Sequence, residues 1–159
     1  MMMKRQGLAA TLAFVLSILL VSGAAAGERL MKRRAPDGWG PGSVYGRMFD
    51  LATLETVTGK VTSIGVFTPP GGSYSGVRMT IDTGTEELSV HIGPRWFITN
   101  QDFELAEGET VEVTGSRVTY EGGPAIIASH MARDDSELLL RDEEGIPYWE
   151  AYRRGRAGR

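Results

Sequence analysis

The chain of 159 residues contains no cysteine. Thiolate nucleophiles, disulfide frameworks, cysteine metal sites and thiol-linked lipid anchors are therefore excluded. Histidine is almost as scarce, with two residues, and no G-x-S-x-G, H-E-x-x-H or P-loop spacing occurs. Because nothing in the sequence organises a nucleophile, a metal-bound water or a phosphate, we expect a protein that is not an enzyme and needs no cofactor.

Long hydrophobic runs are also missing, apart from one near the start. Leu8–Val21 is an apolar run of 14 residues that follows Lys4 and Arg5 and precedes Ala24–Ala26. This arrangement is typical of a secretory signal, and we expect cleavage after Ala26 and export to the periplasm. A helix that spans a bilayer needs about 20 residues, so retention of the run as an anchor is the weaker alternative.

The net charge of −3 conceals a segregation of charge along the chain. Eight basic residues lie near the two ends, namely Arg29, Lys32, Arg33, Arg34, Arg153, Arg154, Arg156 and Arg159. Between Ala35 and Tyr152 there are 7 basic and 19 acidic residues, a net charge of −12. A region this acidic repels phosphate backbones, so any binding of nucleic acid would depend on the arginine-rich ends.

Alternating apolar residues predict five short strands between Glu55 and Arg133. The expected strands are residues 56–67, 77–82, 88–92, 111–118 and 125–128, with one compact helical turn at Gly93–Ile98 after the third. The alternation slips between Val61 and Ile64, which indicates a bulge in the first strand. This order predicts an all-β fold, a five-stranded OB-type Greek-key barrel whose open end is plugged by the turn.

The rest of the chain forms extensions on this barrel. We expect a signal peptide over 1–26, a linker or arm over 27–54, the barrel over 55–133, a segment packed on the barrel over 134–152, and a disordered basic tail over 153–159. Trp39 and Tyr45 stand out in the arm, and two alternatives remain open for them: they dock on the barrel or they stay loose.

OB barrels bind ligands on the face of strands 2 and 3, between the first and last hairpin loops. The alternation places His91 outward on strand 3, beside Arg78 and Thr80 of strand 2 if the hairpin register holds. Tyr74 and Tyr120 would lie at the rim. These five residues are the predicted ligand site.

Metal binding and the stacking of nucleic-acid bases are two further uses of side chains on these strands. His91 and His130 would hold a metal ion only if the barrel brought their strands' outer faces together, and the simpler alternative is that both are solvated. Strands 2 and 3 carry no outward aromatic residue of the kind on which single-stranded nucleic acids stack. That absence also argues against nucleic acid.

Six stretches of sequence carry a resemblance to a known family. They are Gly38-Trp-Gly-Pro, Tyr45-Gly-Arg, Glu55-Thr-Val-Thr-Gly-Lys-Val, Val90-His-Ile-Gly-Pro, Val113-Thr-Gly-Ser-Arg-Val and Leu140-Arg-Asp-Glu-Glu-Gly-Ile-Pro-Tyr-Trp. From about residue 38 to 150 the chain resembles small exported bacterial OB-fold proteins, often labelled DNA-binding proteins, which include magnetosome-associated relatives. The resemblance implies the OB fold, and its DNA-binding label is an analogy of fold.

The sequence therefore favours a periplasmic, non-enzymatic OB-fold protein that binds a protein partner or a small ligand on the strand 2–3 face. Two alternatives stay open: a module that binds single-stranded nucleic acid, and an envelope protein that handles a metal or haem through His91 or His130. A purely structural adaptor in an envelope complex would have the same sequence features.

Overall fold

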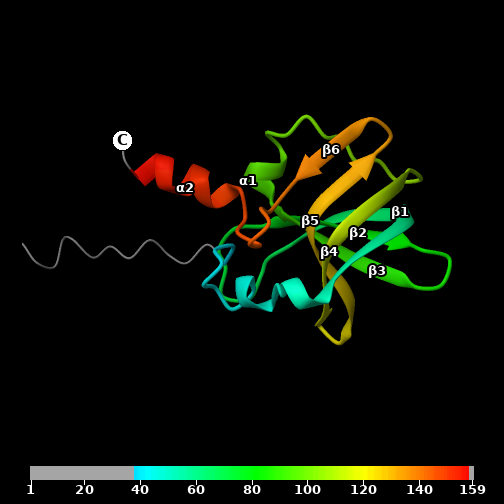
Figure 1. Cartoon of the computed structure of the whole chain (residues 1–159), viewed down its shortest axis with the longest axis horizontal. Coiled ribbons are helices and arrows are strands. Elements are labelled where there is room, and N and C mark those ends of the chain that lie inside the picture. The colour runs from blue at the N-terminus through cyan, green and yellow to red at the C-terminus, as the bar shows by residue number, and fades with distance from the viewer. Residues whose placement is uncertain (1–37, 158–159) are drawn as a thin grey trace, which may run out of the picture. The chain divides into compact units, whose positions relative to one another are not determined.

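The computed structural model describes residues 38–157, and the predicted signal segment lies outside this range. It contains six strands: β1 (Leu54–Phe67), β2 (Gly76–Asp82), β3 (Glu87–Pro94), β4 (Thr110–Tyr120), β5 (Gly123–Arg133) and β6 (Ser136–Leu139) (Figure 1). The helical elements are the 3-10 turns η2 (Gly46–Met48) and η3 (Leu51–Thr53), and the helices α1 (Arg95–Ile98) and α2 (Trp149–Ala157). Within residues 38–157, none of the helices has the length and apolar character required to cross a bilayer.

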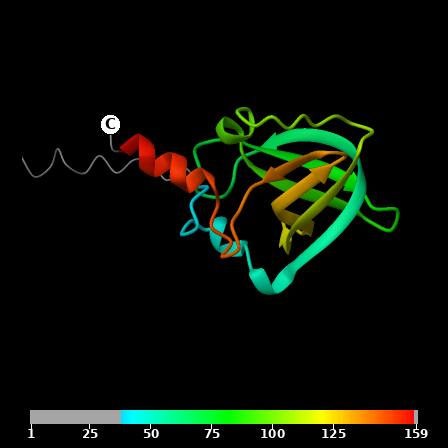
Figure 2. The same cartoon turned by 45° about the horizontal axis from the view of Figure 1, so that its top comes forward.

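The strands close into a barrel because β1 serves two partners. Its first half pairs antiparallel with β4 and its second half with β2, and Lys60 takes part in both pairings. Strand β1 accordingly curves around the other strands (Figure 2). From β2 the pairing continues to β3, then through a parallel ladder to β5, and antiparallel back to β4. The circuit β1-β2-β3-β5-β4 is that of a five-stranded OB barrel, which confirms the predicted fold class.

The predicted irregularity of β1 is confirmed as well. The register between β1 and β2 shifts between Val61 and Ser63, and a bulge of this kind bends a strand sharply. The barrel interior is aliphatic and fully buried, with Val61, Met79, Ile81, Leu88, Val90, Ile92, Val111, Val113, Ile126 and Met131 each at most 1% exposed. The alternation seen in the sequence therefore points the expected residues inward.

The helical turn after β3 is α1, and it follows Pro94 as expected. Phe97 and Ile98 are buried and belong to the same hydrophobic core, whereas Trp96 is half-buried against it. A proline suits this place because its fixed φ matches the entry to a helix and its missing N–H is not needed there. The two buried side chains extend the core beyond the end of β3.

Parts of the two extensions, residues 38–53 and 134–157, fall within the described structure. Residues 38–53, here called the strap, dock on the barrel and bury Trp39 and Tyr45, which decides between the two alternatives left open by the sequence. Strand β6 adds to the free edge of β5. At the other end α2 continues to Ala157, so the backbone is helical over 153–157 where the sequence led us to expect disorder. Residues 158–159 lie outside the described range.

Candidate functional site

The hairpin of β2 and β3 sets the geometry of the predicted ligand face. Arg78 pairs with His91 and Thr80 pairs with Ser89, as the expected register requires. Directly paired residues of antiparallel strands share a face, so these four side chains lie on the same side of the sheet. The strand interior residues Met79 and Val90 point to the opposite side, into the barrel.

His91 is nevertheless closed off from solvent. Its side chain is 1% exposed, because it is covered by an outer aromatic layer, which comprises Trp39, Tyr45, Phe67, Tyr120 and Trp149. The imidazole lies 4.4 Å from the ring of Phe67 and 4.6 Å from that of Tyr120, measured between centroids. The prediction that His91 is an exposed surface residue is therefore wrong: its phase on the strand is outward, but the rings of Phe67 in β1, Tyr120 in β4 and Tyr45 in the strap cover it.

Two glycines admit this layer. A Cβ on Gly76 would overlap the indole ring of Trp39, so only glycine lets that ring approach the β2 backbone this closely. Gly38 has a φ of +80°, and a Cβ there would press on the backbone of Gly72 in the β1–β2 loop. The Trp39 Nε1–H then donates to the carbonyl oxygen of Tyr74 over 2.9 Å. The strap is thus fastened to the first hairpin loop by close packing and by a hydrogen bond.

The imidazole of His91 is held in its neutral form. Burial, with a smaller contribution from the Arg78 guanidinium, lowers the pKa of His91 to about 4. Its Nδ1 is 3.1 Å from the hydroxyl oxygen of Tyr45, whose own pKa is raised by burial. Within residues 38–157 the Nε2 atom has no hydrogen-bond partner. A neutral ring with one unsatisfied nitrogen is costly to bury, so the packing around it has to compensate.

The other half of the strand 2–3 face stays open. Arg78 is exposed, Thr80 and Ser89 are half-exposed, and Tyr120 borders them with a half-exposed ring. Arg78 is close enough to influence the pKa values of both His91 and Tyr120. Tyr74, at 54% exposure, lies in the β1–β2 loop and makes no ring contact with the outer aromatic layer in the described structure. The structure therefore brings Arg78, Thr80, His91 and Tyr120 together and leaves Tyr74 apart.

His130 is not a neighbour of His91. It lies in β5 between β4 and β6, paired with Thr114 and Leu139, and its Nε2 is 3.7 Å from a carboxylate oxygen of Glu137. His91 pairs instead with Arg78 and Ile127. Across residues 38–157 no three His, Asp or Glu side chains converge as a metal site would need. The arrangement of the described residues therefore offers the two histidines no shared ligand set.

Sequence reasoning missed a buried cation. Arg141 is 6% exposed, and its guanidinium carbon lies 4.4 Å from the ring centroid of Phe49 and 5.3 Å from that of Trp149. Its Nη1 donates to the carbonyl oxygen of Gly145, and burial lowers its pKa to about 10. The signal was faint: an arginine directly after the apolar run Leu138–Leu140. It joins the strap to the C-terminal segment through stacking.

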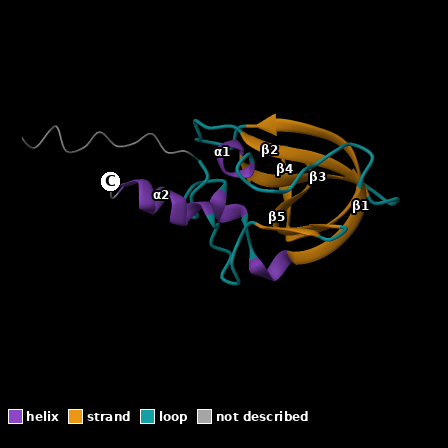
Figure 3. Ribbon diagram, turned by 90° about the horizontal axis from the view of Figure 1, so that it is seen from above, coloured by secondary structure: helices purple, strands orange, loops and turns teal. Residues whose placement is uncertain are grey.

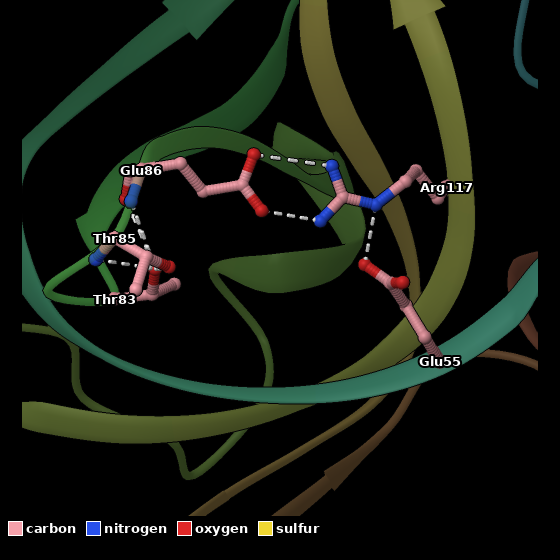
Figure 4. Close-up of polar contacts among 5 residues, drawn as sticks. All are labelled: Glu55, Thr83, Thr85, Glu86 and Arg117. Atoms are coloured by element: carbon pink, nitrogen blue, oxygen red, sulfur yellow. Dashed lines mark hydrogen bonds and ion pairs between the residues drawn. The ribbon is translucent and has the colours of Figure 1, made fainter.

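Sequence reasoning also missed Arg117, which forms ion pairs with residues of two other strand ends. Arg117 of β4 bonds Glu55 at the start of β1 over 2.7 Å and Glu86 in the β2–β3 turn over 2.6 Å (Figure 4). These partners raise the pKa of Arg117, Glu86 first, and Arg117 in turn lowers the pKa of Glu86. All three side chains are about a third exposed, so this cluster aligns strand ends more than it adds stability.

Comparison with known proteins supplies the family. Residues 53–138 match the model of the MamS/MamX magnetosome protein family, a range that begins just before β1 and ends in β6. No curated protein sequence matches the chain. Among solved structures, the S. pombe Stn1-ten1 complex matches with 18% sequence identity and a TM-score of 0.36, over 66% of this chain and 70% of that chain. A likeness at this level says nothing about what the chain binds. Because the family model covers more than half of its residues, the chain belongs to the MamS/MamX magnetosome protein family.

Proposed function

We propose that this chain is a periplasmic, non-enzymatic binding protein that holds a protein partner or a small ligand on the open half of its strand 2–3 face. The open half consists of Arg78, Thr80 and Ser89, bordered by Tyr120. The observation that carries the proposal is the exposed Arg78 beside the fixed, buried pair of His91 and Tyr45. Because His91 and Tyr45 are packed and hydrogen-bonded beside Arg78, less of this surface has to become ordered when a ligand binds there.

The charge of the surroundings favours an anionic group as the feature recognised. Residues 35–152 carry a net charge of −12, and Arg78 places a positive charge on the strand 2–3 face within this acidic region. Arginine binds carboxylates through two parallel N–H donors, and the hydroxyls of Thr80 and Ser89 supply further donors beside it. An acidic peptide segment or a small carboxylate fits this set.

Aromatic side chains at the border offer apolar contact to the same ligand. Tyr120 is half-exposed, and its ring is held edge-on against His91. Tyr74 stands more freely on the β1–β2 loop. A ligand that spans from Arg78 to either ring would gain both charge and burial of apolar surface.

Export and the lack of catalysis are parts of the same proposal. The apolar run Leu8–Val21 and the three alanines up to Ala26 support passage to the periplasm. For catalysis, the described hydroxyl beside the buried His91 is that of Tyr45, which is itself buried and has a pKa raised by burial, so it is neither accessible to a substrate nor readily ionised. A neutral histidine in such surroundings supports binding rather than proton transfer.

Photo-crosslinking tests the location of the binding surface. A photoreactive amino acid at Thr80 in the full chain should give a crosslinked product in the native host envelope, and Arg78→Glu should remove that product. The matched control is the same probe at Thr58, an exposed position of β1 outside the face. Equal crosslinking from Thr58, or crosslinking that ignores Arg78→Glu, would contradict the proposed surface.

Fluorescence anisotropy with a labelled single-stranded oligonucleotide tests the nucleic-acid alternative. On the strand 2–3 face the one ring bordering the open half is Tyr120, and the net charge of the barrel is unfavourable to phosphates. We expect no binding at physiological salt. Binding that persists at physiological salt would mean that the ligand is a nucleic acid and not a peptide or a small carboxylate.

A further inference from the structure

The C-terminal helix differs in charge from the barrel that carries it. Three arginines, Arg153, Arg154 and Arg156, fall within α2, and Arg159 follows it in the sequence. The region from residue 35 to 152 has a net charge of −12. The boundary between the two signs falls at Tyr152, inside the helix.

The base of α2 is fixed to the domain by aromatic side chains. Trp149 is 1% exposed, and its Nε1–H donates to the carbonyl oxygen of Trp39 over 2.9 Å. Phe97 packs against both Trp149 and Tyr152, each with a centroid separation of 5.6 Å. Beyond this anchored first turn, α2 runs away from the strands (Figure 3).

Arg153 bonds Glu150 over 2.7 Å at the base of α2, so the length of the helix separates only the later arginines, Arg154 and Arg156, from the acidic barrel. A helix of nine residues is about 13 Å long. The Debye length at physiological ionic strength is about 8 Å, so charges at the far end are largely screened from the carboxylates of the barrel. Beyond the Arg153–Glu150 pair, α2 therefore carries two positive charges in its sequence, those of Arg154 and Arg156, without a carboxylate.

Amphipathic side chains surround the base of the helix. Tyr152 is 61% exposed and Tyr148 is 41% exposed. The strap lies against the same turn, because a Cβ on Gly40 would come within 3.3 Å of the Glu150 carboxylate, and its Val44 is 58% exposed. Tyrosine and aliphatic side chains next to arginines are the residues that settle at a membrane–water interface.

We propose that α2 docks this domain onto an anionic phospholipid surface, with the arginines against the headgroups and the acidic barrel turned away. Opposite charges at the two ends fix the orientation, since the same surface that attracts α2 repels the barrel. Phospholipid is favoured over nucleic acid because exposed valine and tyrosine at the helix base suit an interface, and because the sequence predicts export. This inference is independent of the ligand proposed for Arg78.

Vesicle flotation with the full chain tests the proposal. Vesicles of phosphatidylcholine alone are compared with vesicles that also contain phosphatidylglycerol, at physiological and at high salt. Each arginine near an anionic surface is worth about fivefold in binding, so replacing Arg154 and Arg156 by glutamine should weaken binding to the anionic vesicles by about tenfold or more. The neutral vesicles report any contribution of the apolar run Leu8–Val21, which is unchanged in every variant.

Two further variants decide whether charge is responsible. Replacing the same two arginines by lysine should preserve binding, because the charge is kept, and Lys60→Gln, an exposed charge change on β1, should leave it unaltered. Binding that is equal on neutral and anionic vesicles, or that survives the glutamine substitutions, would overturn the proposal. So would tighter binding of the same arginines to an oligonucleotide than to anionic vesicles at physiological salt.

Discussion

The two halves of the strand 2–3 face differ although they belong to one hairpin. At one half His91 lies under the outer aromatic layer, and at the other Arg78 stands in solvent beside it. The two residues are directly paired across the hairpin, next to a shift of register between Val77 and Arg78. What differs is the cover, which combines the rings of Phe67 and Tyr120 with Tyr45 of the strap, 46 residues away from His91 in sequence. A position on a sheet thus says which way a side chain points, and a distant segment decides whether it is accessible.

Removing Trp39 from the outer aromatic layer should cause the largest loss in the free energy of unfolding. Trp39→Ala deletes a side chain that is 2% exposed and contacts Tyr45, Phe67 and Trp149. Loss of an aromatic side chain from a packed core costs about 3–5 kcal/mol of the free energy of unfolding. Urea denaturation followed by circular dichroism measures it. Leu139→Ala, at a position 55% exposed, is the control and should stay within about 0.5 kcal/mol. A cost for Trp39→Ala as small as the control's would show that the strap is only loosely held and the whole face is available.

Acid should lower the free energy of unfolding through the covered half of the face, where His91 is buried. Above about pH 6.5 His91 is neutral in the folded and the unfolded chain, so it contributes no pH dependence there. Below that pH the unfolded chain takes up a proton that the folded chain, with a pKa of about 4, does not. Stability therefore falls as the pH drops, by about 2 kcal/mol between pH 7 and pH 4.5.

Urea midpoints measured across this range check the sign and the source of the effect. His91→Gln should flatten the slope, whatever it does to stability at pH 7. His130→Gln removes the half-exposed histidine of β5, away from His91 in β3, and is the comparison variant. If both variants retain the wild-type slope, His91 is not the group responsible.

The hydrogen bond between strap and strand should have a smaller effect. Tyr45→Phe keeps the ring but leaves Nδ1 of His91 without its partner at 3.1 Å, as Nε2 already is. A buried acceptor or donor left unpaired costs about 1–2 kcal/mol in the free energy of unfolding. Tyr152→Phe, on an exposed ring, is the matched control. No difference between the two variants would mean that packing alone holds the strap.

The sequence predicted the barrel well because its signals are local. Alternation in β2 and β3, the slip near Val61 and the proline before α1 each act over a few residues, and each appears in the structure. The alternation of apolar and polar residues within a strand cannot show that Trp39 packs on Gly76, because the two residues are more than thirty positions apart and only the fold brings them together. The fold class was thus predictable, and the cover over His91 was not.

The two arginines missed by the sequence analysis show the same limit. Arg117 reads as an ordinary polar residue of β4, and its partners Glu55 and Glu86 are distant in sequence. Arg141 follows an apolar run, but only the fold brings Phe49 and Trp149 to its guanidinium. Long-range charge and cation–π contacts leave no pattern in a single sequence.

The smallest expected effect links the two halves directly. Arg78→Gln removes the exposed cation that disfavours a second positive charge on His91, so the pKa of His91 should rise from its value of about 4, while the stability at pH 7 stays within about 0.5 kcal/mol of wild type. Titration of the imidazole C–H signals by NMR measures the pKa of His91 in both proteins. Lys60→Gln makes the same change of charge on β1 and should leave that pKa where it was. An unchanged pKa in Arg78→Gln would mean that burial alone keeps His91 neutral, and the open half would then be electrically independent of the covered one; a rise would mean that an anion bound at Arg78 also acts on His91 through the same field.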